Sequence, residues 1–253
     1  MQLLFFLTKV DQAQHNKHLL KQLISGENLF LQNLSIDQVV FGYENRTLFV
    51  LLLEVGPGKW MLPGGYIFKD ESVEGAAKRI LTERTGLSKG YLRQFHVFGD
   101  AERSFSHEIG MLFQHLGIDL PADAWILKRF VSVGYYALIN KRNASPKPLL
   151  LAKGWAWHPV QELPELLLDH GVIVGAALEG LREQLHAAPI AYHLLGETFT
   201  MPELHAVYET IHQKMTDRSR FQKKMFEFDF FERLGRKEGV PHKRPFLYRA
   251  RIG

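Results

Sequence analysis

The stretch from Pro63 to Gly86, "PGGYIFKDESVEGAAKRILTERTG", most constrains what this 253-residue chain can fold into. Two glycines open a tight turn, and the residues after it have the period of a helix with one buried face. Gly86 is placed to end that helix in the left-handed conformation, which glycine adopts without strain. The stretch therefore predicts a glycine-rich loop followed by a helix that packs on a larger body. The expected buried residues, all between Glu71 and Thr85, are Val73, Ala76, Ala77, Ile80 and Leu81.

Segments rich in β-branched and aromatic residues flank this helix on both sides. Before it, residues 37–56 favour two strands joined at Glu44, Asn45 and Arg46, which is a hairpin signal. After it, a long and partly helical excursion, residues 103–129, separates two further strands. Together these segments predict a mixed sheet beside the helix. The remaining strand candidates are 58–65, 91–100, 130–139 and 154–160.

Helical patterns also occur before and after the strands. Residues 13–26 suit a short helix, and residues 163–185 suit one helix or two helices broken near Gly171. The opening "MQLLFFLTKV" is apolar for only about seven residues, whereas a membrane helix needs roughly 20. It also lacks the basic segment and cleavage site of a signal peptide, so we expect a soluble, cytoplasmic protein. In the second helical segment the buried candidates are Leu167, Ile173, Leu178 and Leu181.

The last segment begins with a strong helix-start signal. Thr200 and Glu203 have the spacing of a capping box, with a proline in the first turn. Asp217 can cap a second helix, and two short strands joined by the basic stretch "RKEGVPHKRP" follow it. Two short helices and a basic hairpin predict a winged helix-turn-helix. The apolar faces of the two helices are Leu204, Val207, Tyr208 and Ile211 in the first, and Phe221, Met225 and Phe228 in the second.

The charge of the chain is concentrated in this last segment. The formal net charge is +4, and residues 197–253 carry all of the excess, because the first 196 residues hold equal numbers of basic and acidic side chains. A basic terminal module on a neutral body favours a polyanionic partner. The chain has no cysteine, which excludes disulfides and zinc–thiolate sites. No histidine spacing predicts a metal site either.

The glycine-rich loop and its helix resemble the Nudix box, whose pattern is G-x5-E-x7-R-E-U-x-E-E-x-G-U. In Nudix hydrolases the glutamates of R-E-U-x-E-E hold divalent cations that help to break a diphosphate bond. Those three positions are here Ile80, Glu83 and Arg84, so one carboxylate remains and one position is cationic. Because Mg²⁺ needs several oxygen ligands, we expect no metal, no catalytic residue and no hydrolysis. The residues that match the box are Gly65, Glu71, Arg79, Leu81, Glu83, Gly86 and Leu87.

The same arginines can serve a site without a metal. Arg79 and Arg84 can donate hydrogen bonds directly to a phosphate or to sugar hydroxyls. The alternative is that Arg79 only braces the loop through Glu71 and that Arg84 is a solvated helix residue. Tyr135 and Tyr136 alternate on a strand, so one of them can belong to the core and the other to a pocket. The candidate effector-binding residues are Glu71, Arg79, Glu83, Arg84, Arg129 and Tyr135.

A Nudix-like body followed by a winged helix resembles the NrtR-like transcriptional regulators. The resemblance implies an α+β protein, a Nudix α/β/α sandwich with a mixed sheet followed by a winged helix. It also implies a bacterial homodimer that binds operator DNA and responds to ADP-ribose or a sugar. This chain departs from the commonest pattern before Ser35 and after Phe105, which leaves the effector open. The expected parts are an extension (1–34), the Nudix-like sensor (35–163), a connecting helical segment (164–188) and the winged helix (189–253).

A recognition helix must carry hydrogen-bond donors on its outward face. The wing offers further cations for phosphate or minor-groove contacts, among them Lys237. Two alternatives stay open: a Nudix hydrolase of nucleoside diphosphate derivatives with non-standard metal ligands, and a former enzyme whose basic tail binds protein or RNA. The candidate DNA-binding residues are Arg218, Ser219, Arg220, Gln222, Lys223 and Lys224 on the helix and His242, Lys243 and Arg244 on the wing.

Overall fold

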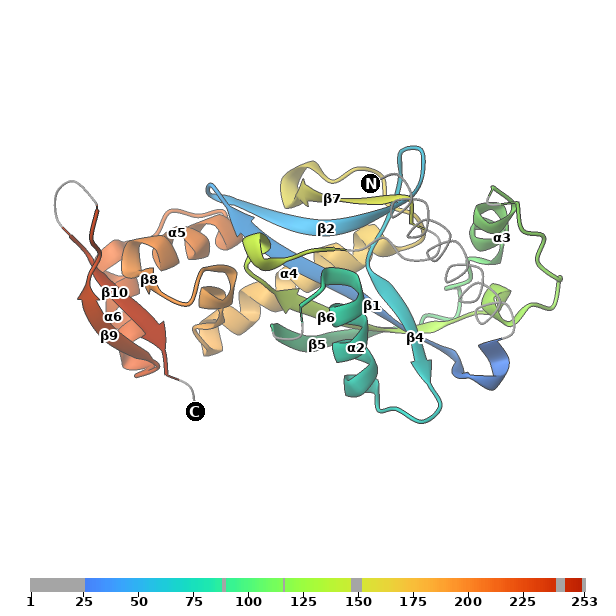
Figure 1. The fold of residues 1–253 in the computed structure, drawn as a ribbon, viewed down its shortest axis with the longest axis horizontal. Coiled ribbons are helices and arrows are strands. Elements are labelled where there is room, and N and C mark those ends of the chain that lie inside the picture. Colours follow the sequence, from blue (N-terminus) through green and yellow to red (C-terminus); the bar gives the residue numbers. More distant parts are fainter. Residues whose placement is uncertain (1–25, 88–89, 116, 147–151, 240–243, 252–253) are drawn as a thin grey trace, which may run out of the picture.

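The computed structural model describes residues 26–251 except for 88–89, 116, 147–151 and 240–243. The helix expected within residues 13–26 therefore lies outside the described residues, apart from Gly26, which begins a short 3-10 turn. The described part is elongated, with the winged helix at one end and helix α3 (Ser106–His115) at the other (Figure 1). No helix in this part of the chain is both long enough and apolar enough to cross a membrane.

A mixed sheet forms the centre of the first domain. Its central strand, β1, pairs antiparallel with β2 and β4 and parallel with β6. The path through the sheet is β3-β2-β1-β6-β5, with β7 paired to β2. The α+β class and the mixed sheet are confirmed. The strands are β1 (Phe30–Glu44), β2 (Thr47–Gly56), β3 (Lys59–Met61), β4 (Gly64–Phe68), β5 (Tyr91–Phe98), β6 (Val131–Leu138) and β7 (Gly154–Pro159).

The predicted hairpin between β1 and β2 is confirmed. Glu44 pairs with Thr47, and the two residues between them, Asn45 and Arg46, have φ values of 48° and 58°. Positive φ at both central positions is the geometry of a type I′ turn, whose twist matches that of the strands it joins. The tip of this hairpin meets the winged helix, because Arg46 pairs with Glu209 there.

Helix α2 (Val73–Thr85) covers one face of the sheet, and helix α4 (His170–Ala187) covers the other. Ser72 caps α2 by accepting a hydrogen bond from the backbone N–H of Gly75, so the helix starts two residues after the predicted start at Glu71. Gly86 ends it with a φ of 73°, as its position in the sequence predicts. Helix α4 is continuous from His170 and is not broken near Gly171, but residues 163–169, which the sequence pattern assigns to the helical segment, are not helical.

The last domain is the winged helix that the sequence predicts. Helix α5 (Met201–His212) begins with the Thr200–Glu203 capping box, and helix α6 (Arg218–Glu227) begins at the Asp217 cap. Strands β9 (Phe231–Arg236) and β10 (Phe246–Ala250) form the wing hairpin. A two-residue strand that the sequence did not indicate, β8 (Phe199–Thr200), adds a third strand beside β10.

One hydrophobic core runs through both domains. It contains residues of the central sheet, such as Val39 and Tyr136, together with Leu181 of α4 and Leu204 and Phe221 of the winged helix. All of these side chains are buried. The two domains are therefore packed into one another, and a displacement of α4 or the sheet acts on the winged helix through direct contact.

Candidate functional site

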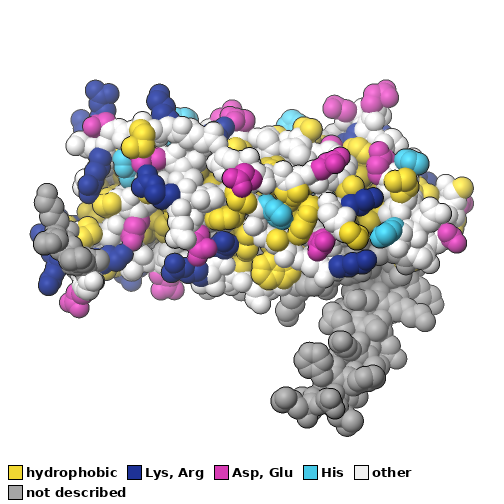
Figure 2. All heavy atoms as spheres, turned by 90° about the horizontal axis from the view of Figure 1, so that it is seen from above, with side chains coloured by type: hydrophobic (Ala, Val, Ile, Leu, Met, Phe, Trp, Pro, Cys, Tyr) yellow, Lys and Arg dark blue, Asp and Glu magenta, His cyan; other side chains and the backbone are white. Residues whose placement is uncertain are grey.

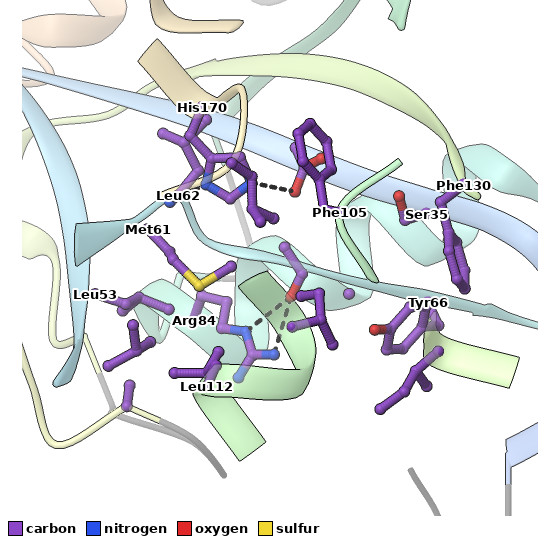
Figure 3. Close-up of a pocket in the computed structure, with 18 of the residues that line it drawn as sticks. Ser35, Leu53, Met61, Leu62, Tyr66, Arg84, Phe105, Leu112, Phe130 and His170 are labelled. Carbon is purple, nitrogen blue, oxygen red and sulfur yellow. Dashed lines mark hydrogen bonds and ion pairs between the residues drawn. The ribbon is translucent and has the colours of Figure 1, made fainter. Parts of the chain in front are cut away.

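A cavity of about 300 Å³ is lined by residues of β1 to β4 and lies between the glycine-rich turn, the end of α2, and α3. Its wall is mostly apolar and aromatic, and a few charged groups face into it (Figure 3). The excursion predicted between residues 103 and 129 forms this wall: α3 and the 3-10 turn at Trp125–Leu127 pack Phe113 and Ile126 against Phe30 and Tyr66. Concave, largely apolar sites with a few polar groups are typical of small-molecule binding.

The glycine-rich turn comes very close to β1 at this cavity. A side chain at Gly64 would place its Cβ only 2.7 Å from the Asp37 carboxylate and from the Ile36 carbonyl oxygen. Glycine is therefore required there for the turn to approach the strand. The close approach of Gly64 to β1 places Asp37 directly behind the loop, where it lines the cavity.

Arg79 braces the loop through Glu71, which is one of the two roles that the sequence predicts for it. Its Nη2 donates to Glu71 Oε1 at 2.6 Å and to the Tyr66 carbonyl oxygen at 2.8 Å, and its Nη1 lies 3.3 Å from Glu83. Burial alone would lower the pKa of Arg79, but the hydrogen bonds that it donates to Glu71 and the charges of Glu83 and Glu71 raise it. Arg79 therefore has its charge compensated within the protein.

Arg84 is bound differently. Its Nε and Nη2 both donate to the carbonyl oxygen of Gly64, at 3.2 and 2.9 Å. Its Nη1 is buried without a hydrogen-bond partner, and none of the described carboxylates forms an ion pair with it. Burial lowers the pKa of Arg84. The guanidinium lies among Leu53, Met61 and Leu112 in the cavity wall (Figure 3). It is thus not the solvated helix residue of the alternative reading.

Ile80, the other altered position of the box, is fully buried. It belongs to the apolar layer between α2 and the sheet, together with Ile36, Ile67 and Tyr135. A Cβ placed on Gly65 would come within 3.1 Å of its side chain, so Ile80 fills the space beneath the loop. Across the described residues, no group of three or more histidines and carboxylates is arranged to hold a metal ion.

A buried polar cluster beside the cavity was not predicted. His170, the first residue of α4, accepts a hydrogen bond at Nδ1 from the backbone N–H of Leu62 (2.9 Å), and its Nε2 lies 3.6 Å from Asp37 Oδ1. Because Nδ1 is the acceptor, the neutral ring carries its proton on Nε2, which faces Asp37. Burial lowers the pKa of His170, although the charges of Asp37 and Asp169 oppose this effect.

Arg103 completes the cluster. Its Nε and Nη2 donate to the two oxygens of Asp169, at 2.7 and 3.0 Å, and its Nη1 donates to the carbonyl oxygen of Phe130. Its Nη2 also lies 3.8 Å from Asp37 Oδ2, which accepts a hydrogen bond from Ser132. Arg103 therefore ties the cavity wall to the start of α4. In the sequence, the charged residue Asp37 within the apolar run "IDQVVFG" is the feature from which this cluster could have been predicted.

Of the six predicted effector-binding residues, the cavity brings together Arg79, Glu83 and Arg84. The other three do not line it. Glu71 faces Arg79 behind the loop. Burial raises the pKa of Glu71, but the hydrogen bonds that it accepts from Arg79 and from the backbone of Phe68 outweigh burial and lower it. Tyr135 lies in the core layer under α2, and exposed Arg129 donates to backbone oxygens of Gly99 and Asp100. We therefore leave these three out of the proposed site.

The outward face of α6 carries the predicted cluster of cations. Arg218, Arg220 and Lys223 are exposed, and no ion pair to them is present in the described part of the chain. The opposite face, with Phe221 and Met225, is buried against α5. Ser219 is exposed as well, while Gln222 and Lys224 are partly buried. Several Lys and Arg side chains stand out at this end of the molecule (Figure 2).

The wing differs in part from the prediction. Lys237 forms an ion pair with Glu203 of the capping box, with 2.6 Å between Nζ and Oε1, so its charge is compensated. Arg244 is exposed, and its carbonyl oxygen accepts a hydrogen bond from Arg236. His242 and Lys243 lie outside the described residues.

Polar contacts join the first domain to the helix-turn-helix. Arg46, at the tip of the β1–β2 hairpin, pairs with Glu209 of α5, with 3.1 Å between Nη2 and Oε2. The second oxygen of Glu209 accepts a hydrogen bond from the backbone N–H of Thr216, in the turn before α6. On α4, Arg182 donates to the carbonyl oxygen of Ile211 at 2.9 Å. The turn between α5 and α6 is thus fixed by contacts with the β1–β2 hairpin and with α4.

Comparison with known proteins agrees with this architecture. Residues 33–174 match the family described as NUDIX domain, and residues 191–250 match the NrtR DNA-binding winged helix domain. The ADPR responsive transcriptional repressor NtrR of Acinetobacter baylyi is 26% identical over 225 residues, which cover 85% of this chain and 81% of that protein.

Solved structures are similar over most of the chain. The crystal structure of Shewanella oneidensis NrtR complexed with a 27mer DNA is 26% identical, covers 87% of this chain and 94% of its own, and has a TM-score of 0.68. A MutT/nudix family protein from Enterococcus faecalis shares the fold at 23% identity, with 87% of each chain covered and a TM-score of 0.64. The chain therefore belongs to the Nudix family and combines its Nudix domain with an NrtR-type winged helix domain.

Proposed function

We propose that this protein is a ligand-responsive transcriptional regulator that binds operator DNA through α6 and the wing and senses a metabolite of the sugar or ADP-ribose class in the Nudix cavity. The observation that carries the proposal is the row of exposed cations on α6, to which no described carboxylate forms an ion pair, presented by a helix-turn-helix whose other face is buried. Donors on the outward face of a second helix are what major-groove reading requires.

The relatives support the same role. The similar protein of Acinetobacter baylyi is described as an ADPR responsive repressor, and the similar Shewanella oneidensis protein was crystallised with a 27mer DNA. Both similarities extend over more than four fifths of this chain, which is more than either domain alone.

We propose further that the Nudix cavity binds its ligand without hydrolysing it. Two of the three glutamate positions are occupied by Ile80, which fills apolar space, and by Arg84, whose charge would repel a cation. Two unit charges about 4 Å apart interact by roughly 4 kcal/mol at an effective dielectric of about 20. The hydrolase alternative would need several carboxylates around a divalent ion, and the described residues supply no such group.

The cavity and the DNA-binding helix are connected by two elements. Strand β1 carries Asp37 at the cavity and leads to the hairpin tip, where Arg46 meets Glu209. Helix α4 starts at the cavity with His170 and reaches α5 through Arg182. A ligand that moves either element shifts the orientation of α6, provided that it binds one of the two arrangements more tightly.

Selection of random-sequence duplexes with the full-length protein tests the proposal. We expect enrichment of a two-fold symmetric site, read by two copies of the chain, and a change in its affinity when ADP-ribose or one of a panel of pentoses is added. Weak binding without sequence preference at physiological salt would contradict the proposal. A preference for single-stranded RNA would instead favour an RNA-binding role for the basic domain.

Removing Arg46 is expected to reduce the ligand response more than DNA binding itself. In Arg46→Ala, operator affinity without ligand should stay within about threefold, because Arg46 is largely exposed and buried Glu209 keeps the hydrogen bond from Thr216. Ion pairs with an exposed partner contribute only about 0.2–1 kcal/mol. The ratio of affinities with and without the ligand should fall about two- to thirtyfold, since residues on a coupling path change coupling by roughly 0.5–2 kcal/mol.

Fluorescence anisotropy on the selected operator, with and without the active ligand, measures both quantities. Arg142→Ala is the matched control, because Arg142 is an exposed arginine near the same hairpin that lies 3.8 Å from Glu44. An unchanged affinity ratio in Arg46→Ala would show that the hairpin does not transmit the ligand signal.

A further inference from the structure

Phe226 is an exposed aromatic residue on the outward face of α6. Its side chain is 47% exposed, whereas Phe221 and Met225, on the opposite face of the helix, are buried. Phe226 follows Ser219 by seven residues and Lys223 by three, and residues with these spacings lie on one face of a helix. Phe226 therefore stands in line with side chains that are proposed to contact DNA.

The wing hairpin supports the ring of Phe226. The ring contacts Tyr248 of β10, with 5.9 Å between the two ring centroids, and Tyr248 is itself buried. Tyr248 pairs with Arg233 of β9, and residues directly opposite one another in an antiparallel pair lie on the same side of the hairpin. The side of the hairpin that carries Arg233 is thus the side against which Phe226 packs, while nearly half of the Phe226 side chain stays open to solvent.

Two arginines on this side of the hairpin are held in place by an aromatic ring. The guanidinium carbons of Arg233 and Arg236 lie 4.6 and 4.4 Å from the centre of the Phe246 ring. Both arginines are exposed, and none of the carboxylates in the described part of the chain forms an ion pair with them. A guanidinium stacked in this way loses less freedom when it binds an anion, because its position is already restricted. The hairpin therefore offers positive charge beside Phe226.

Duplex DNA matches both parts of this surface. Its phosphates can contact the cations, and thymine presents the one methyl group that the four bases display in the major groove. A protein partner would have to supply equal negative charge to the same cations, since burying them without it is unfavourable. Helix α6 carries one carboxylate, that of Glu227, which forms no ion pair with Lys223 in the described structure. An apolar ring among these cations thus fits the groove of a polyanion.

We propose that Phe226 is a specificity-determining residue that contacts the C5-methyl group of one thymine in each half of the operator. The inference rests on the proposed role of α6 as the recognition helix, and it names one base that this helix selects. Seven residues of helix rise about 10 Å, which is the height of about three base pairs at roughly 3.4 Å each. Ser219 and Phe226 therefore reach different bases, and an apolar contact with the methyl group distinguishes thymine from the other three.

Exchanging thymine for deoxyuridine tests the proposal, because the exchange removes the methyl group and keeps every hydrogen-bonding group of the base. Each thymine of the selected operator is exchanged in turn, in both half-sites together, and the affinity is measured by fluorescence anisotropy. At one position we expect the unaltered protein to lose about fifteenfold in affinity, or about fourfold for each half-site, since burying one methyl-sized group contributes about 0.8 kcal/mol.

In Phe226→Ala the same exchange is expected to change the affinity by less than about twofold, because the ring that contacts the methyl group is absent. Val97→Ala is the matched control: Val97 lies on β5 of the first domain and is also 47% exposed, so its truncation should leave the effect of the exchange unchanged. Thermal unfolding shows whether each variant is folded. The comparison of the two bases in the unaltered protein does not depend on any variant.

An operator in which no thymine exchange weakens binding would overturn the inference. An exchange that weakens Phe226→Ala as much as the unaltered protein would overturn it as well, because another residue would then contact the methyl group. Both results leave the regulator role intact, since each requires that an operator has been selected. Selection that enriches no duplex would instead remove the regulator role, and this inference with it.

Discussion

Replacing Arg218 and Lys223 together by alanine is expected to weaken binding to the selected operator by about a hundredfold or more. Both side chains are exposed on the outward face of α6, and the described carboxylates leave their charges uncompensated. Losing a cation that reads a base edge costs about 1–3 kcal/mol, and losing one that contacts only phosphate lowers the salt dependence of binding by about one unit of slope. The loss therefore depends on sequence if α6 lies in the major groove.

Anisotropy titrations on the operator and on a scrambled duplex, at several salt concentrations, separate the two contributions. Lys59→Ala is the matched control, since Lys59 is an exposed lysine on β3 of the first domain. If the double variant binds the operator as tightly as the unaltered protein, α6 is not the recognition helix. If both duplexes lose affinity equally, these two residues contact phosphate and not bases.

Replacing Phe221 by alanine is expected to destabilise the protein by about 3–5 kcal/mol and to remove operator binding, because truncating a buried phenylalanine leaves a cavity. The Phe221 ring packs between His205 and Tyr208 of α5, with centroids 4.7 and 4.9 Å away, and it fixes the angle between α5 and α6. For a chain of this size the loss corresponds to a fall of roughly 10 °C in Tm.

Phe226→Ala provides the comparison within the same helix. Phe226 is 47% exposed, whereas Phe221 is 8% exposed. Its truncation should cost less than about 1 kcal/mol, since surface substitutions have small effects. Calorimetry of the two variants checks the expectation. Equal falls in Tm would mean that α6 is not anchored through Phe221.

The parts of the fold that the sequence predicts are those encoded by neighbouring residues. The turn at Asn45 and Arg46, the Thr200–Glu203 capping box and the stop at Gly86 depend on residues within one or two turns of each other. The conformation of each is therefore decided locally, and each was found where the pattern placed it.

The candidate site could be predicted only in part, because its contacts join distant positions. Arg103 and Asp169 are 66 residues apart, and Leu62 and His170 are 108 residues apart. Such pairs exist only once the excursion and α4 have packed on the sheet. The alternation of Tyr135 and Tyr136 correctly separates two faces, but helices cover both faces there, and the cavity is lined by residues of β1 to β4 and not of β6. For this reason neither tyrosine reaches it.

The core shared by the sheet, α4 and the winged helix also bears on how such a regulator can evolve. One continuous apolar cluster contains Val39, Leu181 and Leu204. At the junction, therefore, each domain has an apolar face that is covered only by the other domain. The winged helix is for this reason not an exchangeable module: a gene fusion that joins it to an unrelated sensor would expose the buried faces of both. Changes of DNA specificity must therefore arise on the outer face of α6, and changes of ligand inside the cavity, while the junction between them is inherited as a unit.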